Sequence, residues 1–177
     1  MPKRIRAVIL CEDRQQEVFA RYFLEQCGIT PIRVLVGLPG RGSGEHFVRV
    51  TYPQQVKIFR SKFPNQPDTR LVVLTDADTR TVAERFKQLE DELAANNLAK
   101  RNPQDRIGIF IPKRSIETWI YYIEANTADE DQVYPDLDKP SDCKEFVTRL
   151  ARNRQDPLPE DAPSSLQTAC EELERVL

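Results

Sequence analysis

Three short apolar runs along the chain are each followed at once by charged residues and then by a helical repeat. The runs cover residues 5–11, 71–74 and 107–111. Their length and their many β-branched side chains predict buried strands. After the second run, apolar residues recur at helical spacing and form one stripe: Val82, Phe86, Leu89 and Leu93. Strands that alternate with helices predict an α/β fold, doubly wound, with a mainly parallel central sheet and helices on both faces.

The pattern changes beyond this central part of the chain. Residues 129–142 are acidic and broken by prolines, and two short helical stretches follow them. We therefore expect an α/β domain over residues 1–128, a linker over 129–142 and a small C-terminal helical extension over 143–177. Between the first helix and the second apolar run, a strand is predicted near residues 32–38 and a helix over residues 52–62.

Acidic residues stand where the predicted strands end. Glu12 follows the first run, Asp76 and Asp78 follow the second, and Glu117 lies in the first turn of the helix after the third. The carboxyl ends of parallel strands meet at one edge of a sheet, and alternate residues of an extended chain point the same way. The four carboxylates are therefore candidate ligands for Mg²⁺ or Mn²⁺. Helix capping and complementing the helix macrodipole are the alternative roles.

Basic residues near the same edge are candidates for phosphate binding. Lys113 and Arg114 follow the third run, and Arg41 and Arg49 lie in or just after the glycine-rich segment 37–46. Guanidinium and ammonium groups bind phosphate well, although solvated surface charge is the commoner role of a single basic residue. The glycine-rich segment lacks the Gly-Lys-Ser/Thr ending of a P-loop, and a flexible connector is the alternative for it.

Composition narrows the range of functions. The 177 residues carry a formal net charge of −2, so a nucleic-acid-binding surface would have to be local. His46 is the only histidine and the four cysteines have no C-x-x-C spacing, which disfavours zinc sites and disulfides. We see no long apolar run and no signal-peptide pattern, so we expect a cytoplasmic protein without membrane contact.

The order of these acidic residues resembles the Toprim domain of topoisomerases, primases and OLD-family nucleases. A strand ending in Glu12 precedes a strand ending in Asp76-x-Asp78, and the element with Glu117-x-Trp119 comes later. The opening Cys-Glu-Asp-Arg-Gln-Gln-Glu is closest to small Toprim-like proteins of bacterial defence loci, the RloB-like ones included. The resemblance covers residues 5–125. Two positions depart from the family pattern: Asp13 replaces the usual glycine, and Gln16 the acidic residue often found there.

The resemblance implies Mg²⁺-dependent phosphodiester hydrolysis on DNA or RNA. Glu12 would act as general acid/base or metal ligand. One or two ions would be held by Glu12, Asp76 and Asp78, with Glu117 as a ligand of the second ion. Lys113 or Arg114 would offset charge on the phosphate. The alternative is a non-catalytic sensor or regulatory subunit that works with a partner ATPase. A homodimer would suit a nucleic-acid channel.

Three other protein classes share part of this acidic pattern. They are receiver-like phosphoacceptors, phosphatases of the haloacid dehalogenase type and sugar-nucleotide transferases. In the phosphatases, however, the Asp-x-Asp normally lies on the first strand. A shared pattern of this kind does not by itself fix function.

Overall fold

The computed structural model describes residues 4–177, and their strands form a single parallel sheet in the order β2-β1-β3-β4. The strands are β1 (Arg6–Cys11), β2 (Ile32–Val36), β3 (Thr69–Leu74) and β4 (Ile107–Phe110). The predicted α/β fold with a parallel central sheet is confirmed. Three of the strands were predicted from apolar runs, and β2 corresponds to the strand predicted near residues 32–38.

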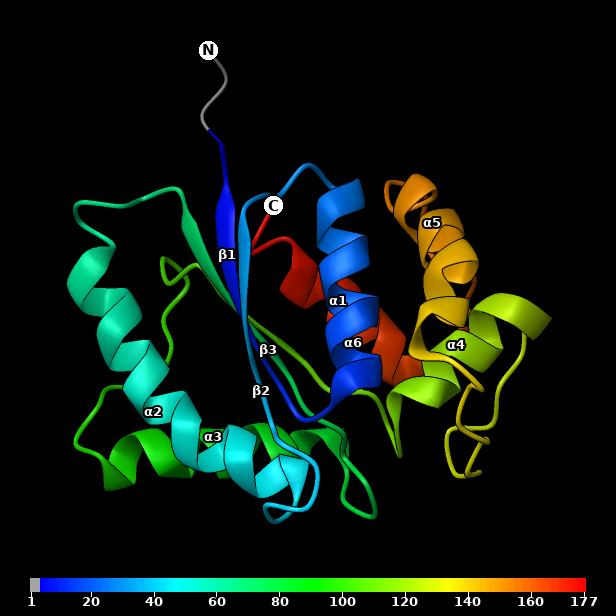
Figure 1. The fold of residues 1–177 in the computed structure, drawn as a ribbon, viewed down its shortest axis with the longest axis horizontal. Helices are drawn as coiled ribbons and strands as arrows, with labels where there is room; N and C mark the ends of the chain where they lie inside the picture. Colours follow the sequence, from blue (N-terminus) through cyan, green and yellow to red (C-terminus); the bar gives the residue numbers. More distant parts are fainter. Residues whose placement is uncertain (1–3) are drawn as a thin grey trace.

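Helices cover both faces of this sheet, as predicted (Figure 1). One face is covered by α2 (Gly44–Lys62) and α3 (Val82–Ala95). The other is covered by α1 (Arg14–Gln26), α4 (Ile116–Ala125), α5 (Lys144–Arg152) and α6 (Ser164–Leu173), with a short 3₁₀ turn, η1 (Pro140–Cys143), before α5. No helix within residues 4–177 is both long and apolar enough to span a bilayer.

The core consists of two apolar clusters, one on each side of the sheet. Successive residues of a strand point to opposite faces. Ile9 therefore packs with Phe19 and Trp119 in one cluster, while its neighbour Leu10 packs with Tyr52 in the other. Because both faces are buried, the strands read as continuous apolar runs instead of alternating ones.

The chain reverses direction across the sheet between β1 and β3. It leaves β1 through α1 on one face, and it leaves β3 through α3 on the opposite face. The connections after these two adjacent strands therefore diverge at their carboxyl ends, which makes this place the switch point of the sheet. Ligands of open α/β sheets bind at such a switch point.

Two helices begin at places other than those the sequence predicted. The helix expected from residue 52 starts at Gly44, because the Ser43 hydroxyl accepts the N–H of His46 (3.2 Å) and the helix continues through Pro53. Helix capping was the alternative role for Asp78, but α3 is capped by Thr81 instead, in a capping box with Glu84.

The C-terminal extension contributes to the main core. Apolar residues of α6 belong to the cluster that includes Ile9 and Trp119. The buried Glu172 carboxylate accepts the backbone N–H of Ile109 (2.8 Å) in β4 and pairs with Arg101. The predicted helices of 143–177 are present, and packing joins them closely to the α/β domain.

Candidate functional site

Glu12 bridges the carboxyl ends of β1 and β3. It follows the last residue of β1, and its Oε1 accepts hydrogen bonds from the Thr75 hydroxyl and from the backbone N–H of Asp76 (2.8 Å). Both donors come directly after β3. The carboxylate is therefore fixed in position at the switch point of the sheet.

The first turn of α1 holds the backbone of Glu12. Asp13 caps the helix by accepting the N–H of Gln16 (2.9 Å), and the Gln16 side chain accepts the N–H of Glu12 (2.9 Å). Sequence reasoning did not assign roles to Asp13, Gln16 or Thr75. The helix-cap preference of aspartate was the one signal that pointed to Asp13.

Asp76 is a buried carboxyl that lacks a full set of partners. Its residue is 7 % exposed, and within residues 4–177 its Oδ1 has no hydrogen-bond partner. Burial, and next the charge of Glu12, raises the pKa of Asp76 well above its usual value. The nearby amide of Gln16 offsets part of this rise but completes no hydrogen bond to the carboxyl. An unsatisfied buried oxygen of this kind is costly to the fold and calls for a ligand or a functional role.

The environment of Glu12 shifts the pKa of its carboxyl upward, close to neutral pH. Burial raises the pKa of Glu12 to about 7, although the hydrogen bonds from Thr75 and Asp76 oppose the shift. The charges of Asp78 and Asp13 contribute to this rise. A carboxyl with a pKa near neutrality is well suited to proton transfer, and a nearby cation would favour its ionised form.

The Asp78 side chain does not align with that of Asp76 as the sequence predicted. The prediction assumed an extended chain through residue 78, but the backbone there is left-handed, with a φ of 55°. The side chain of Asp78 is 56 % exposed and pairs with Arg85 (3.1 Å). Asp78 is therefore an ion-pair partner of Arg85. Its charge still raises the pKa of Glu12.

Arg85 organises the turn that carries Asp76 and Asp78. Its guanidinium is buried and donates to the backbone oxygens of Asp76 (3.0 Å) and Ala77 (3.3 Å). It also pairs with Glu45 of α2 (2.9 Å). Nothing local in the sequence marks this role of Arg85, because its partners lie on another helix and in a turn.

Replacing Arg85 with methionine is expected to lower the free energy of unfolding by about 3 kcal/mol or more. Buried carbonyls would lose their donor, and Glu45 would keep its pair with Arg49 but lose the one with Arg85. The matched control is Lys87→Met on the same helix. Lys87 forms an exposed pair with Asp91, so its loss is expected to cost less than about 0.5 kcal/mol. Urea denaturation of both variants measures the difference, and equal effects would contradict the assigned role of Arg85.

Glu117 lies in the first turn of α4. Its side chain is half-buried, and burial raises its pKa. The charge of Glu117 in turn raises the pKa of Asp76. Within residues 4–177, however, no hydrogen bond joins Glu117 to Glu12 or Asp76, so it is a neighbour of that pair and not part of its bonded network.

Three of the four basic candidates are engaged by acidic or backbone partners. Lys113 pairs with the Asp131 carboxylate (3.1 Å), and Arg114 donates to the backbone oxygen of Asp131 (3.1 and 3.2 Å). Arg49 is bound between Glu45 (3.0 Å) and Glu92 (2.6 Å). The predicted linker thus folds back over the residues that follow β4.

Arg41 belongs to the glycine-rich segment that closes over Glu12. This segment and the start of α1 line a hollow of about 770 Å³ that includes Glu12 itself. A Cβ atom on Gly44 would lie 2.6 Å from the Glu12 Cβ, and one on Gly37 would lie 2.6 Å from the Glu12 backbone oxygen. The glycines permit a backbone approach that no other residue allows.

Gly44→Ala is therefore expected to lower the free energy of unfolding by about 1–3 kcal/mol, since the new methyl group overlaps Glu12. Gly40→Ala is the control, because a Cβ there meets no atom within 4 Å and only its positive φ of 77° carries a cost. That backbone cost is about 1 kcal/mol. Thermal denaturation compares the two, and the packing of the segment against Glu12 is refuted if Gly40→Ala proves the more damaging.

Comparison of the chain with protein families, curated proteins and solved structures finds no match. Within residues 4–177, no group of three or more His, Cys, Asp or Glu side chains is placed to hold a metal ion. What the structure brings together is a pair of carboxyls, Glu12 and Asp76, with Glu117 nearby. The Toprim resemblance stays a prediction.

Proposed function

We propose that the carboxyl ends of β1 and β3 bind Mg²⁺ or Mn²⁺ and that the protein hydrolyses phosphodiester bonds in nucleic acid. The observation that carries this proposal is the buried, unpartnered Oδ1 of Asp76 beside the Glu12 carboxyl. Two acidic groups in one buried place repel each other, and a divalent cation relieves this repulsion.

The donor set fits the coordination chemistry of magnesium. Mg²⁺ commonly takes one or two protein carboxylates and completes its shell with water and substrate phosphates. Glu12 and Asp76 would supply the carboxylates. Glu117 would act as a nearby third charge, whereas Asp78 would serve mainly through its pair with Arg85.

A bound divalent ion would supply charge neutralisation at the phosphate and acidify a water molecule. In this reaction the ionised Glu12 carboxylate would accept the proton of the attacking water. Thr75 and the backbone of Asp76 would hold the carboxylate in place during the transfer. The bound ion would favour the ionised form of Asp76.

The hollow beside Glu12 would receive the nucleic-acid backbone. Arg41 is exposed on its wall, and guanidinium groups bind phosphate oxygens in a bidentate manner. Lys113 and Arg114 would join the substrate only after leaving Asp131. A nucleic-acid substrate agrees with the Toprim resemblance, and a cytoplasmic location agrees with the sequence pattern.

The decisive experiment incubates the purified protein with single- and double-stranded DNA and RNA in Mg²⁺ or Mn²⁺. We expect metal-dependent cleavage that chelator stops and that Asp76→Asn abolishes. Asp78→Asn is the matched control and is expected to keep most of the activity. A protein that binds the metal yet leaves every substrate intact would instead support the non-catalytic subunit that works with a partner ATPase.

A further inference from the structure

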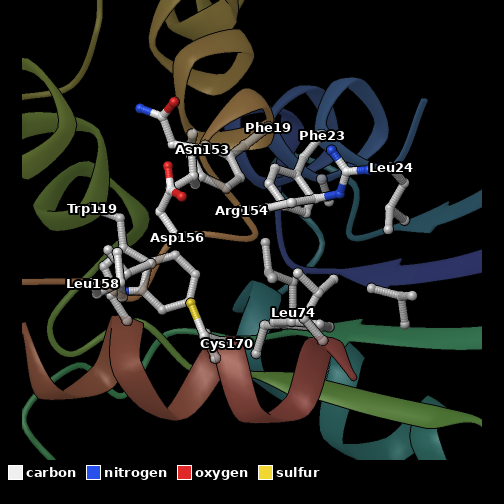
Figure 2. Close-up of a pocket in the computed structure, with 17 residues that line it drawn as sticks. Phe19, Phe23, Leu24, Leu74, Trp119, Asn153, Arg154, Asp156, Leu158 and Cys170 are labelled. Atoms are coloured by element: carbon white, nitrogen blue, oxygen red, sulfur yellow. The ribbon is translucent and has the colours of Figure 1, made fainter. Parts of the chain in front are cut away.

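A second cavity lies between α1, α6 and the sheet (Figure 2). It holds about 100 Å³, and its walls are almost wholly apolar. Residues from distant parts of the chain form these walls: Phe19, Phe23, Leu24, Leu74, Trp119, Leu158 and Cys170 among others. None of them belongs to the carboxyl pair at the switch point.

Such a space is unusual in a folded protein. Interiors are packed as densely as organic crystals, and voids larger than a water molecule are few. Apolar walls offer water no hydrogen bonds, and a dry apolar cavity of about 150 Å³ is known to take up benzene. A cavity of about 100 Å³ therefore suits an apolar group of about the size of a leucine side chain.

The mouth of this cavity carries polar groups of both signs. Asn153, Arg154 and Asp156 come from the segment that joins α5 to α6. Figure 2 shows Asn153 and Asp156 on one side and the Arg154 guanidinium on the other, beside Phe23 and Leu24. Arg154 donates to the backbone oxygen of Ala151 (2.9 Å). Among the ion pairs of residues 4–177, none includes Arg154 or Asp156. One cationic and one anionic group thus flank the entrance to an apolar space without neutralising each other.

We propose that this cavity binds a free amino acid with an apolar side chain. The side chain would fill the space next to Trp119, the carboxylate would bind the Arg154 guanidinium, and the ammonium group would bind Asp156. A zwitterion matches the two charges at the mouth, whereas a fatty acid or an aliphatic amine would satisfy only one of them. Ligand pockets combine apolar walls with a few placed polar groups in this way.

Trp119 provides a direct readout of occupancy. It is the only tryptophan in the chain, it lines the cavity, and its indole N–H donates to the Ser165 hydroxyl (2.8 Å). A ligand that enters the cavity changes the surroundings of this indole. The emission of the whole protein therefore reports on this one place.

The experiment titrates the full chain with L-leucine, L-methionine and L-phenylalanine, and follows Trp119 emission and calorimetric heat. We expect saturable binding of at least one of them with a Kd of about 1 mM or tighter. Arg154→Met and Asp156→Asn are each expected to weaken it at least about tenfold, the loss of one charged contact. Both residues are exposed, so these variants should fold normally.

Matched controls separate the proposal from general apolar binding. Arg152→Met changes a neighbouring exposed arginine outside the cavity wall and is expected to leave the Kd unchanged. Two leucine analogues, 4-methylpentanoate and 3-methylbutylamine, each lack one charge and should bind at least about tenfold more weakly. Equal binding of either analogue, or no response to any amino acid up to about 10 mM, would overturn the proposal.

Discussion

Asp76→Asn is expected to change the protein in two opposite directions. At pH 8 without divalent metal, the variant should be more stable than the wild type by about 1–3 kcal/mol, because a buried carboxylate with an unpartnered oxygen becomes a neutral amide. With Mg²⁺ or Mn²⁺ present, the variant should lose the stabilisation that the ion gives to the wild type. At a metal concentration of about 100 times Kd, that stabilisation amounts to about 2.7 kcal/mol.

Denaturant unfolding with metal and with chelator measures both effects, and the cleavage assay measures activity in parallel. The activity of Asp76→Asn should fall at least about a hundredfold. Asp78→Asn serves as the control, since its exposed side chain pairs with Arg85 and should respond to metal as the wild type does. If Asp76→Asn is less stable than the wild type without metal and still gains stability from it, Asp76 has a structural role and the proposed site is wrong.

Stability is also expected to depend on pH through Glu12. Its pKa in the folded protein is about 7, raised by burial from an ordinary value of 4.5. A raised carboxyl pKa means that the folded state holds the proton more tightly than the unfolded chain. The stabilisation that the protonated Glu12 gives to the folded state is therefore full below pH 4.5 and is lost as the pH rises through about 7. The free energy of unfolding falls by about 3 kcal/mol over this range.

Glu12→Gln isolates this contribution, since the amide oxygen can still accept the hydrogen bonds from Thr75 and Asp76. Unfolding curves between pH 4.5 and 8 in chelator should show a flatter pH dependence for the variant than for the wild type. Saturating Mg²⁺ should also flatten the wild-type profile, because the ion favours the ionised carboxyl. A wild-type stability that rises over this range in parallel with the variant would show that Glu12 is not buried as described.

The fold was accessible from sequence because its signals are local. Runs such as residues 71–74 are apolar throughout because both faces of a parallel strand are buried, and the acidic residues follow where the strands stop. Glu12 and Asp76 were therefore predicted to share one edge, and the structure joins them through the hydrogen bond between Oε1 and the Asp76 N–H.

Other parts of the site depend on contacts between distant residues, which no local pattern records. The left-handed backbone of Asp78 follows from its contacts with Arg85 and with the backbone of Arg114, and so the expected alignment with Asp76 does not form. Likewise, Asp131 contacts Lys113 only after the chain has folded back over α4. The approach of Gly44 to Glu12 depends on where α2 begins, and the sequence placed that start too late.

Glu172 limits how this protein can associate with other chains. The Glu172 carboxylate accepts a hydrogen bond from the backbone N–H of Ile109, in the edge strand β4. A strand added at that edge would need this N–H as a donor. Arg101 holds the carboxylate in that position. Assembly by strand addition is therefore blocked along β4, and any partner that extends the sheet has to do so beside β2.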